Sequence, residues 1–216
     1  MSRRTIAIAA ALSVLALGSP LIIANANPLA TQYFNQGFEK YEAGNYQGAI
    51  ADFTKAIEIN PQYTIAYKNR GLARSNLEDY QGAIADWSKA IEINPRYADA
   101  YYNRGNTKYV LQDYQGAIAD YIKAIEINPQ DADSYNNRGS AKNNLGDYQG
   151  AIADFNKAIE IDPQHADAYG NRGFSKGVGF QDSDGACSDF KKAASLGLEY
   201  RINWLNSDEG AWCRNM

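Results

Sequence analysis

Residues 114–129 read YQGAIADYIKAIEINP, and this phrase occurs three more times with few changes. The other copies occupy residues 46–61, 80–95 and 148–163, so each copy begins 34 residues after the previous one. A fixed period of this length is typical of proteins in which structural repeats stack on their neighbours. We therefore expect the 216-residue chain to fold largely as one continuous array of repeats.

Each unit has the pattern of two helices, as residues 98–131 illustrate. We expect a first helix over 98–111 and a second over 115–127, where apolar residues recur at steps of three and four. Asp113 is placed to cap the second helix, because its side chain can accept a hydrogen bond from a free first-turn amide. Asn128-Pro129 should end that helix, since the residue before a proline disfavours helical geometry.

Small and aromatic residues recur in register in every unit. In the first helix an aromatic precedes a glycine by four residues: Tyr33 and Gly37, Tyr67 and Gly71, Tyr101 and Gly105, Tyr135 and Gly139, Tyr169 and Gly173. In the second helix an alanine, an aromatic and an alanine precede a proline: Ala49, Phe53 and Ala56; Ala83, Trp87 and Ala90; Ala117, Tyr121 and Ala124; Ala151, Phe155 and Ala158. Small residues let two helix backbones approach, and the aromatic ring fills the space beside them.

This pattern resembles the tetratricopeptide repeat (TPR) family over residues 30–198. The resemblance implies an all-α, right-handed superhelical solenoid that binds other proteins. It also implies five repeats, at residues 30–63, 64–97, 98–131, 132–165 and 166–198.

The last repeat and the C-terminus depart from this pattern. The run Lys176-Gly177-Val178-Gly179 is expected to loosen the first helix of the fifth repeat, and one residue is inserted before Gly185. Terminal repeats are often atypical because one face meets water. We expect residues 199–216 to form a cap, with a short helix from Glu199 to Leu205 and a tail folded back on the last repeat. This stretch also resembles exported repeat proteins of cyanobacteria.

Residues 1–26 have the three parts of a secretory signal peptide. Arg3 and Arg4 precede a largely apolar stretch from Thr5 to Ala24, and Ala24-Asn25-Ala26 provides an A-x-A cleavage site. A retained membrane anchor is the alternative, because the apolar stretch is about long enough to span a bilayer. Both interpretations place the rest of the chain outside the cytoplasm, in a periplasm, a lumen or the extracellular space.

The composition argues against several classes of function. The net charge is −4, and removal of residues 1–26 would leave 19 basic and 25 acidic residues, a net charge of −6. An acidic surface repels phosphate backbones, so we expect no nucleic-acid partner. The only histidine, His165, lies in a turn where a solvent-exposed structural role is expected. With no catalytic triad in view, the sequence predicts a protein that is not an enzyme.

Two weaker motifs receive a structural interpretation. Asp182-Ser183-Asp184-Gly185 lacks the flanking carboxylates of a calcium loop, so we expect a plain turn between helices. The glycines between Gly170 and Gly179 lack the Walker pattern and a preceding strand, so nucleotide binding is not expected. The sequence thus predicts no metal and no cofactor.

Cys187 and Cys213 form an even pair in a chain expected to reach an oxidising compartment. A disulfide between them would fasten the tail to the last repeat and contribute about 3 kcal/mol. Two free thiols are the alternative, because Cys187 also falls where the other repeats carry a buried isoleucine.

One asparagine recurs in the first helix of every unit: Asn35, Asn69, Asn103, Asn137 and Asn171. Asparagine is a mediocre helix former, so five in register call for an explanation. In TPR proteins this face of the first helix lines the concave surface, where each amide could donate to and accept from a peptide backbone. The alternative is a structural hydrogen bond within the repeat.

The neighbours of these asparagines vary along the array, as a specificity surface would. Phe34 and Phe38 make the N-terminal end aromatic, whereas Asp99, Asp133 and Asp167 make the middle acidic. Lys68, Tyr102 and Asn106 complete the candidate peptide-binding set. The groove offers little positive charge for a C-terminal carboxylate, so the sequence predicts an internal, extended or basic protein segment as ligand. Two other functions stay open, a structural spacer and an accessory domain to an enzyme.

Arginines follow four of the asparagines, at Arg70, Arg104, Arg138 and Arg172, and aspartates recur in the second helices at Asp86, Asp120 and Asp154. We favour an Arg–Asp ion pair within each repeat. The alternative is a basic stripe that binds an acidic partner.

Overall fold

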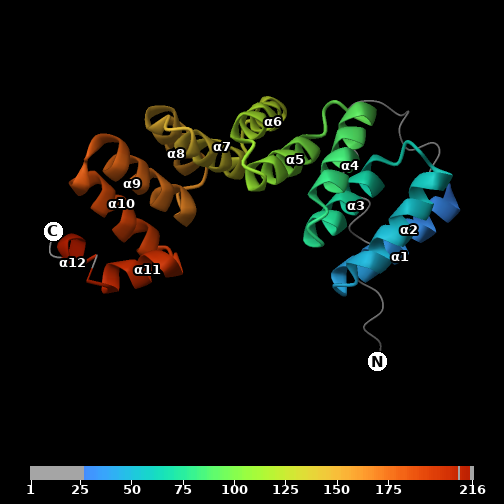
Figure 1. Cartoon of the computed structure of the whole chain (residues 1–216), viewed down its shortest axis with the longest axis horizontal. Helices are drawn as coiled ribbons and strands as arrows, with labels where there is room; N and C mark the ends of the chain where they lie inside the picture. The colour runs from blue at the N-terminus through green and yellow to red at the C-terminus, as the bar shows by residue number, and fades with distance from the viewer. Residues whose placement is uncertain (1–26, 209, 215–216) are drawn as a thin grey trace.

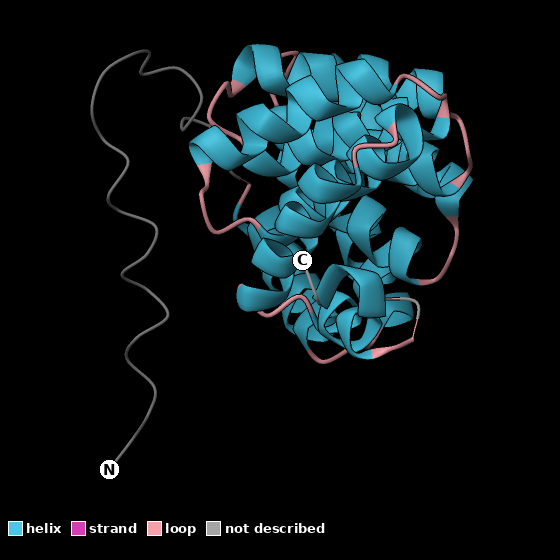
Figure 2. Ribbon diagram, turned by 90° about the vertical axis from the view of Figure 1, so that its left-hand side faces the viewer, coloured by secondary structure: helices cyan, strands magenta, loops and turns pink. Residues whose placement is uncertain are grey.

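The computed structural model describes residues 27–208 and 210–214, and this part of the chain contains helices and no strand (Figure 2). The helices follow one another along an arc from α1 at one end to α11 and α12 at the other (Figure 1). The predicted fold class, an all-α solenoid of helix-turn-helix repeats, is confirmed. The predicted signal peptide lies outside the described residues. Within the described part, no helix is long and apolar enough to cross a bilayer.

Five pairs of antiparallel helices form the array. They are α1 (Pro28–Glu42) and α2 (Tyr46–Ile59), α3 (Thr64–Asn76) and α4 (Tyr80–Ile93), α5 (Ala98–Val110) and α6 (Tyr114–Ile127), α7 (Ala132–Asn144) and α8 (Tyr148–Ile161), α9 (Ala166–Phe180) and α10 (Ser183–Ser195). The predicted helices over 98–111 and 115–127 therefore match α5 and α6 to within one residue at each end. Two short helices, α11 (Glu199–Asn206) and α12 (Ala211–Arg214), close the C-terminal end.

The turn inside each pair is built from a capping side chain and a left-handed residue. Asp113 caps α6 as predicted, because its carboxylate accepts a hydrogen bond from the Gly116 amide at 2.9 Å. The residue before the cap has positive φ, at 62° for Gln112 and 61° for Glu78. Asp182 caps α10, because its carboxylate accepts a hydrogen bond from the Gly185 amide at 2.9 Å, and this segment forms the predicted turn between helices.

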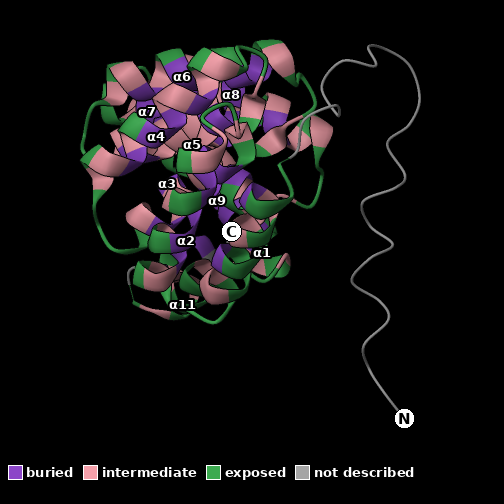
Figure 3. Cartoon of the chain, turned by 90° about the vertical axis from the view of Figure 1, so that its right-hand side faces the viewer, coloured by how far each residue is buried: buried purple, intermediate pink, exposed green. Residues whose placement is uncertain are grey.

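Within each pair, the recurring aromatic of the second helix lies against the recurring glycine of the first. A Cβ atom on Gly105 would lie 2.8 Å from the ring of Tyr121, and one on Gly71 would lie 2.7 Å from the indole of Trp87. Both aromatic side chains are 1% exposed. The buried positions lie where neighbouring helices face each other, as Figure 3 shows. The core is therefore a row of aromatic rings, each packed against a glycine that has no side chain to obstruct it.

The predicted ion pairs within repeats are confirmed. The guanidinium group of Arg104 donates to both carboxylate oxygens of Asp120, at 2.9 and 2.6 Å. Arg70 and Asp86, Arg138 and Asp154, and Arg172 and Asp189 form equivalent pairs. The side chains of these four arginines are 12–18% exposed and those of the aspartates 3–5%. The arginines therefore do not form a basic stripe at the surface.

The fifth repeat differs from expectation in its first helix. Helix α9 continues through Gly177 and Gly179 to Phe180, so the prediction of a loosened helix was wrong. The physical reason is close packing, because a Cβ atom on Gly179 would lie 2.5 Å from Tyr148 of the preceding repeat. Gly179 lets the helix run past this side chain, and α9 has 15 residues where α7 has 13.

His165 is also placed differently from the prediction. It lies in the expected turn, but its side chain is only 11% exposed. Its Nδ1 atom accepts a hydrogen bond from the Ala168 amide at 3.3 Å, and its Nε2 atom lies 3.1 Å from a carboxylate oxygen of Asp133. A neutral imidazole satisfies both contacts when Nε2 bears the proton. His165 is therefore a helix cap that also contacts the previous repeat.

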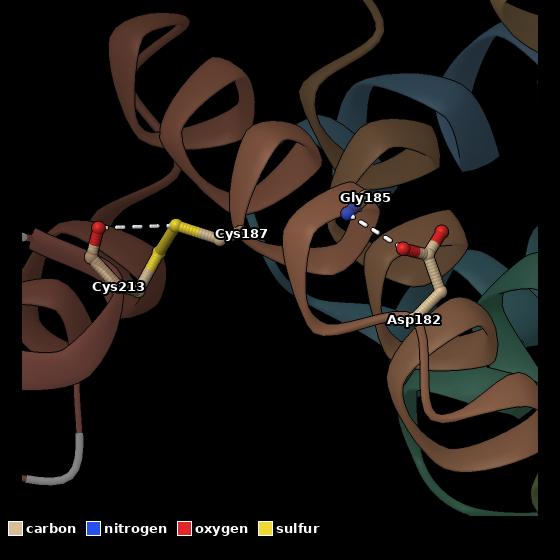
Figure 4. Close-up of a disulfide and its surroundings, with 4 residues drawn as sticks. All are labelled: Asp182, Gly185, Cys187 and Cys213. Atoms are coloured by element: carbon tan, nitrogen blue, oxygen red, sulfur yellow. Dashed lines mark hydrogen bonds between the residues drawn. A yellow bond between two sulfur atoms is a disulfide. The ribbon is translucent and has the colours of Figure 1, made fainter. Parts of the chain in front are cut away.

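The C-terminal tail folds back on the last repeat through the predicted disulfide. Cys187 of α10 and Cys213 of α12 are joined with their Cα atoms 5.4 Å apart (Figure 4). Cys213 is fully buried. Trp204 of α11 packs edge to face on Phe190, with ring centroids 5.0 Å apart, and Trp212 packs on Trp204 in turn. The tail thus covers the aromatic core of the fifth repeat.

Candidate functional site

Three pockets lie along the surface that the odd-numbered helices form, which we call the inner surface. The first pocket, of about 380 Å³, is lined by Lys68, Leu72, Ala98, Asp99, Tyr102, Asn103, Asn128, Asp131 and Asp133. The second, of about 450 Å³, is lined by Asn106, Tyr109, Val110, Tyr121, Asn136, Asn137, Ser140, Asp167 and Asn171. The third, of about 380 Å³, shares three residues with the second and adds Asn143, Asn144, Tyr148 and Phe174. Almost every wall residue is polar or aromatic.

A chain of carboxamides forms the floor of the second pocket. Asn171 donates to the Oδ1 atom of Asn136 at 3.0 Å, and Asn136 donates to Asn137 at 3.0 Å. Asn137 then donates to the Oδ1 atom of Asn106 at 3.0 Å. The same oxygen accepts from the buried Tyr121 hydroxyl at 2.7 Å. The carboxamides of three consecutive repeats are therefore held in fixed orientations.

One acceptor and one donor, at opposite ends of this chain of hydrogen bonds, are available to a ligand. The carboxamide oxygen of Asn171 and the amide nitrogen of Asn106 take no part in the hydrogen bonds just described. A carboxamide offers two donors and two acceptor lone pairs, so both side chains retain hydrogen-bonding groups. An extended polypeptide presents its own N–H and C=O groups in the same alternating way.

The recurring asparagines do not all have the same surroundings. Asn103, Asn137 and Asn171 line the pockets. Asn69 is 9% exposed and Asn35 is exposed, and neither lines any of the three pockets. The structure thus places Asn137 and Asn171 in one pocket and Asn103 in another.

The hydrogen bonds of the pocket asparagines bear on the two interpretations drawn from the sequence. Asn103 donates to the backbone carbonyl of Asp99 in its own helix at 2.7 Å. Asn137 and Asn171 instead donate to side chains of the preceding repeat. Part of each amide therefore has a structural role, and the bonds mostly join successive repeats.

The other predicted site residues also line the pockets. Lys68 lies in the first pocket, where its ammonium group is 3.3 Å from a carboxylate oxygen of Asp99. The Tyr102 hydroxyl accepts a hydrogen bond from Asn137 at 3.2 Å. Burial raises the pKa of Tyr102, so the hydroxyl stays protonated and keeps its own hydrogen to donate.

Several pocket residues were not predicted as site residues, above all Asn136, Asn144 and Tyr109. The available signal was helix propensity, because α7 contains four asparagines among its 13 residues. Each costs a few tenths of a kcal/mol relative to alanine in a helix. Asn144 donates to the Tyr109 hydroxyl of the preceding repeat at 2.9 Å.

The charges along the pockets are mostly negative. The charged wall residues are one lysine and four aspartates, Lys68 with Asp99, Asp131, Asp133 and Asp167, for a net charge of −3. No cluster of histidine, cysteine and carboxylate side chains suited to a metal ion occurs within the described ranges. The chemistry that the pockets offer is hydrogen bonding, aromatic contact and attraction of cations.

Sequence comparison agrees with this geometry. The family model for the tetratricopeptide repeat matches residues 30–63, 98–131 and 132–165, and a second TPR repeat model matches residues 74–112. Together these matches cover more than half of the chain. Comparison with curated protein sequences gave no match.

Solved structures resemble the fold over most of its length. A crystal structure of MamA is 26% identical, with a TM-score of 0.71, over 83% of this chain and 97% of MamA. MamA from Desulfovibrio magneticus is 22% identical, with a TM-score of 0.72, over 82% and 97%. YrrB, described as a TPR protein with an unusual peptide-binding site, is 22% identical, with a TM-score of 0.69, over 87% and 92%. The chain belongs to the tetratricopeptide repeat family.

Proposed function

We propose that this protein is a non-catalytic scaffold that binds an extended segment of another protein along the inner surface of α3, α5, α7 and α9. The observation that carries the proposal is the row of three pockets whose walls are amides, hydroxyls and aromatic rings. Such groups suit a polypeptide backbone, which must find hydrogen-bond partners when it leaves water. YrrB, a similar fold described as having a peptide-binding site, supports the same reading.

The fixed carboxamides favour binding of an extended chain. Because Asn136, Asn137 and Asn171 are already held by one another, little side-chain entropy is lost when a ligand arrives. An extended segment rises about 3.3 Å per residue and adjacent helices lie about 10 Å apart, so a stretch of roughly nine residues would span the surface from α3 to α9. A compact ligand would fill one pocket only.

The ligand is proposed to be an internal or basic segment. A free C-terminal carboxylate would meet a net charge of −3 along the pocket walls. The one lysine there already contacts Asp99 at 3.3 Å. Lysine and arginine side chains of a ligand would instead find exposed carboxylates.

We also propose that the scaffold works outside the cytoplasm, where it assists assembly of a membrane or envelope complex. The signal-like residues 1–26 and the disulfide between Cys187 and Cys213 support this location, because disulfides persist in oxidising compartments.

Selection from a random-peptide display library tests the proposal. Enriched peptides are expected to bind saturably, and the Asn103→Ala/Asn137→Ala double variant should weaken binding about 5- to 100-fold, as loss of two hydrogen bonds predicts. Asn35→Ala is the matched control, because Asn35 occupies the same repeat position but lies outside the pockets. Equal binding by the double variant would contradict the proposed site. Absence of any saturable peptide would favour a structural spacer.

A further inference from the structure

The inner surface has two parts of different chemistry, and the first is apolar. At the N-terminal end, Phe34 stacks on Phe38 with ring centroids 6.5 Å apart, and Phe38 remains 45% exposed. On α3, Ile65 is 42% exposed and lies two turns before Leu72, on the same face of the helix. Leu72 forms part of the wall of the first pocket. Bulky apolar groups therefore extend from α1 to the edge of that pocket.

The second part is acidic and regularly spaced. Asp99, Asp133 and Asp167 each occupy the second residue of α5, α7 and α9. The first two line the first pocket and the third lines the second pocket. The side chains of Asp99 and Asp133 are 58% and 68% exposed, so both can meet a ligand.

Helix packing gives the distance between these carboxylates. Side chains of α7 and α9 donate hydrogen bonds to the preceding odd-numbered helix, so these helices lie side by side, and the axes of adjacent helices are about 10 Å apart. Equivalent residues of α5, α7 and α9 are therefore separated by about three residues of an extended chain at roughly 3.3 Å per residue. Basic side chains three residues apart would match this ladder of carboxylates.

We propose that the partner segment has two parts, a bulky apolar stretch that lies over α1 and α3 and a stretch with lysine or arginine at every third residue over α5, α7 and α9. This inference rests on the proposed function and specifies its ligand. Charge complementarity selects this occupant, because the pocket walls have a net charge of −3, whereas Phe38 and Ile65 at the N-terminal end are apolar and 45% and 42% exposed.

Synthetic fluorescent peptides test the two-part ligand by anisotropy with the purified protein. One peptide joins a Leu/Phe block to three Lys-Ser-Ser triplets, and it is made in both block orders. An isomer of the same composition places its lysines side by side, and another peptide replaces lysine by glutamate. We expect the spaced-lysine peptide, in one block order, to bind at least five-fold more tightly than its isomer and to bind less well at high salt. The glutamate peptide should bind most weakly.

Variants of the protein distinguish specific charge pairing from nonspecific peptide binding. Asp133→Asn should weaken binding of the spaced-lysine peptide about two- to five-fold, the range for an exposed ion pair. Glu126→Gln is the matched control, because this 54%-exposed carboxylate lies on α6 and outside the pockets. An unchanged affinity in Asp133→Asn, or equal binding of the glutamate peptide, would overturn the inference.

The outcomes also distinguish the inference from the proposed function. If display-selected peptides bind to the pockets but the spaced-lysine peptide does not, the proposal of a two-part ligand is wrong and the proposal of a peptide-binding scaffold is retained. If no peptide of any charge binds saturably, the scaffold proposal fails and the two-part ligand fails with it.

Discussion

Replacing Asp120 by asparagine should strongly destabilise the middle of the array. The Asp120 carboxylate accepts two hydrogen bonds from Arg104 and lies 2.8 Å from the ammonium group of Lys108. Its side chain is 5% exposed, whereas those of Arg104 and Lys108 are 18% and 22% exposed. Asparagine has nearly the same shape, so Asp120→Asn removes the charge and leaves two cations without their counter-ion.

The structure sets the expected magnitude. Loss of one partner from a buried ion pair costs about 3–5 kcal/mol. Both cations of Asp120 reach some water, so we expect the lower end of that range, about 3 kcal/mol. With a urea slope of about 2–3 kcal/mol per molar, the unfolding midpoint should fall by about 1–1.5 M.

Urea unfolding followed by far-ultraviolet circular dichroism measures this effect. Hydrogen exchange should place the loss of protection in α5 and α6 and in the helices that contact them, because repeat proteins gain stability mainly from nearest neighbours. Glu126→Gln on the outer face of α6 is the control and should leave the midpoint unchanged. A midpoint for Asp120→Asn equal to that of the control would refute the view that these ion pairs hold the repeats together.

Four further predictions follow from single contacts. Ile122→Thr should stabilise the protein by about 1 kcal/mol in urea unfolding. Ile122 is 37% exposed and occupies the repeat position at which Thr54 and Ser88 accept a hydrogen bond from the arginine 16 residues later, which for Ile122 is Arg138. A lower midpoint would contradict this. Glu78→Gly should stabilise by about 1 kcal/mol, since the φ of Glu78 is 61°, and a fall in the thermal midpoint would count against it. Burial raises the pKa of Tyr97 to about 12, and its unfolded value is about 10, so the unfolded chain loses a proton between these pH values that the folded chain keeps. Stability should therefore fall as pH rises through this window, and Tyr97→Phe should reduce that slope in unfolding experiments at pH 9 to 12. Cys213→Ser should lower the free energy of unfolding by about 3 kcal/mol, with an earlier change in tryptophan fluorescence, and an unchanged midpoint would show that the disulfide adds nothing.

The repeat unit could be predicted from sequence because its determinants are local. Asp113 caps α6 through a residue three positions away, and Asn128-Pro129 ends the same helix. Gly105 and Tyr121 lie within one helical hairpin, 16 residues apart, so their packing also follows from the pattern of one repeat. The Arg104 and Asp120 pair is equally local.

The details of the candidate site could not be predicted in the same way. Its hydrogen bonds join residues of successive repeats, such as Asn171 with Asn136 and Asn144 with Tyr109, each pair 35 residues apart. Whether these side chains meet depends on how one repeat is rotated against the next, which the spacing of residues does not specify. Six of the eight candidate residues predicted from the sequence line the pockets, and Asn136, Asn144 and Tyr109 line them without having been predicted.

The fifth repeat shows why local rules failed at the C-terminal end. Glycines normally weaken a helix, yet α9 runs through Gly177 and Gly179, and at Gly179 the backbone packs so closely on Tyr148 of the preceding repeat that a larger residue would clash. The sequence likewise predicts a solvent-exposed turn at His165, whereas in the structure its side chain contacts Asp133 of the preceding repeat. In both cases a contact between repeats outweighs the local preference.

The distribution of charge shows a further property that composition conceals. The chain is nearly balanced, with 21 basic and 25 acidic residues. In each of the last four repeats, however, a buried aspartate such as Asp120 forms ion pairs with an arginine and with a second basic side chain. These ion pairs hold cations inside the helical hairpins, and the charged side chains that line the pockets are mainly aspartates. The ion pairs that stabilise the solenoid thus keep eight of its arginines and lysines away from the pockets, where Asp99, Asp131, Asp133 and Asp167 outnumber Lys68.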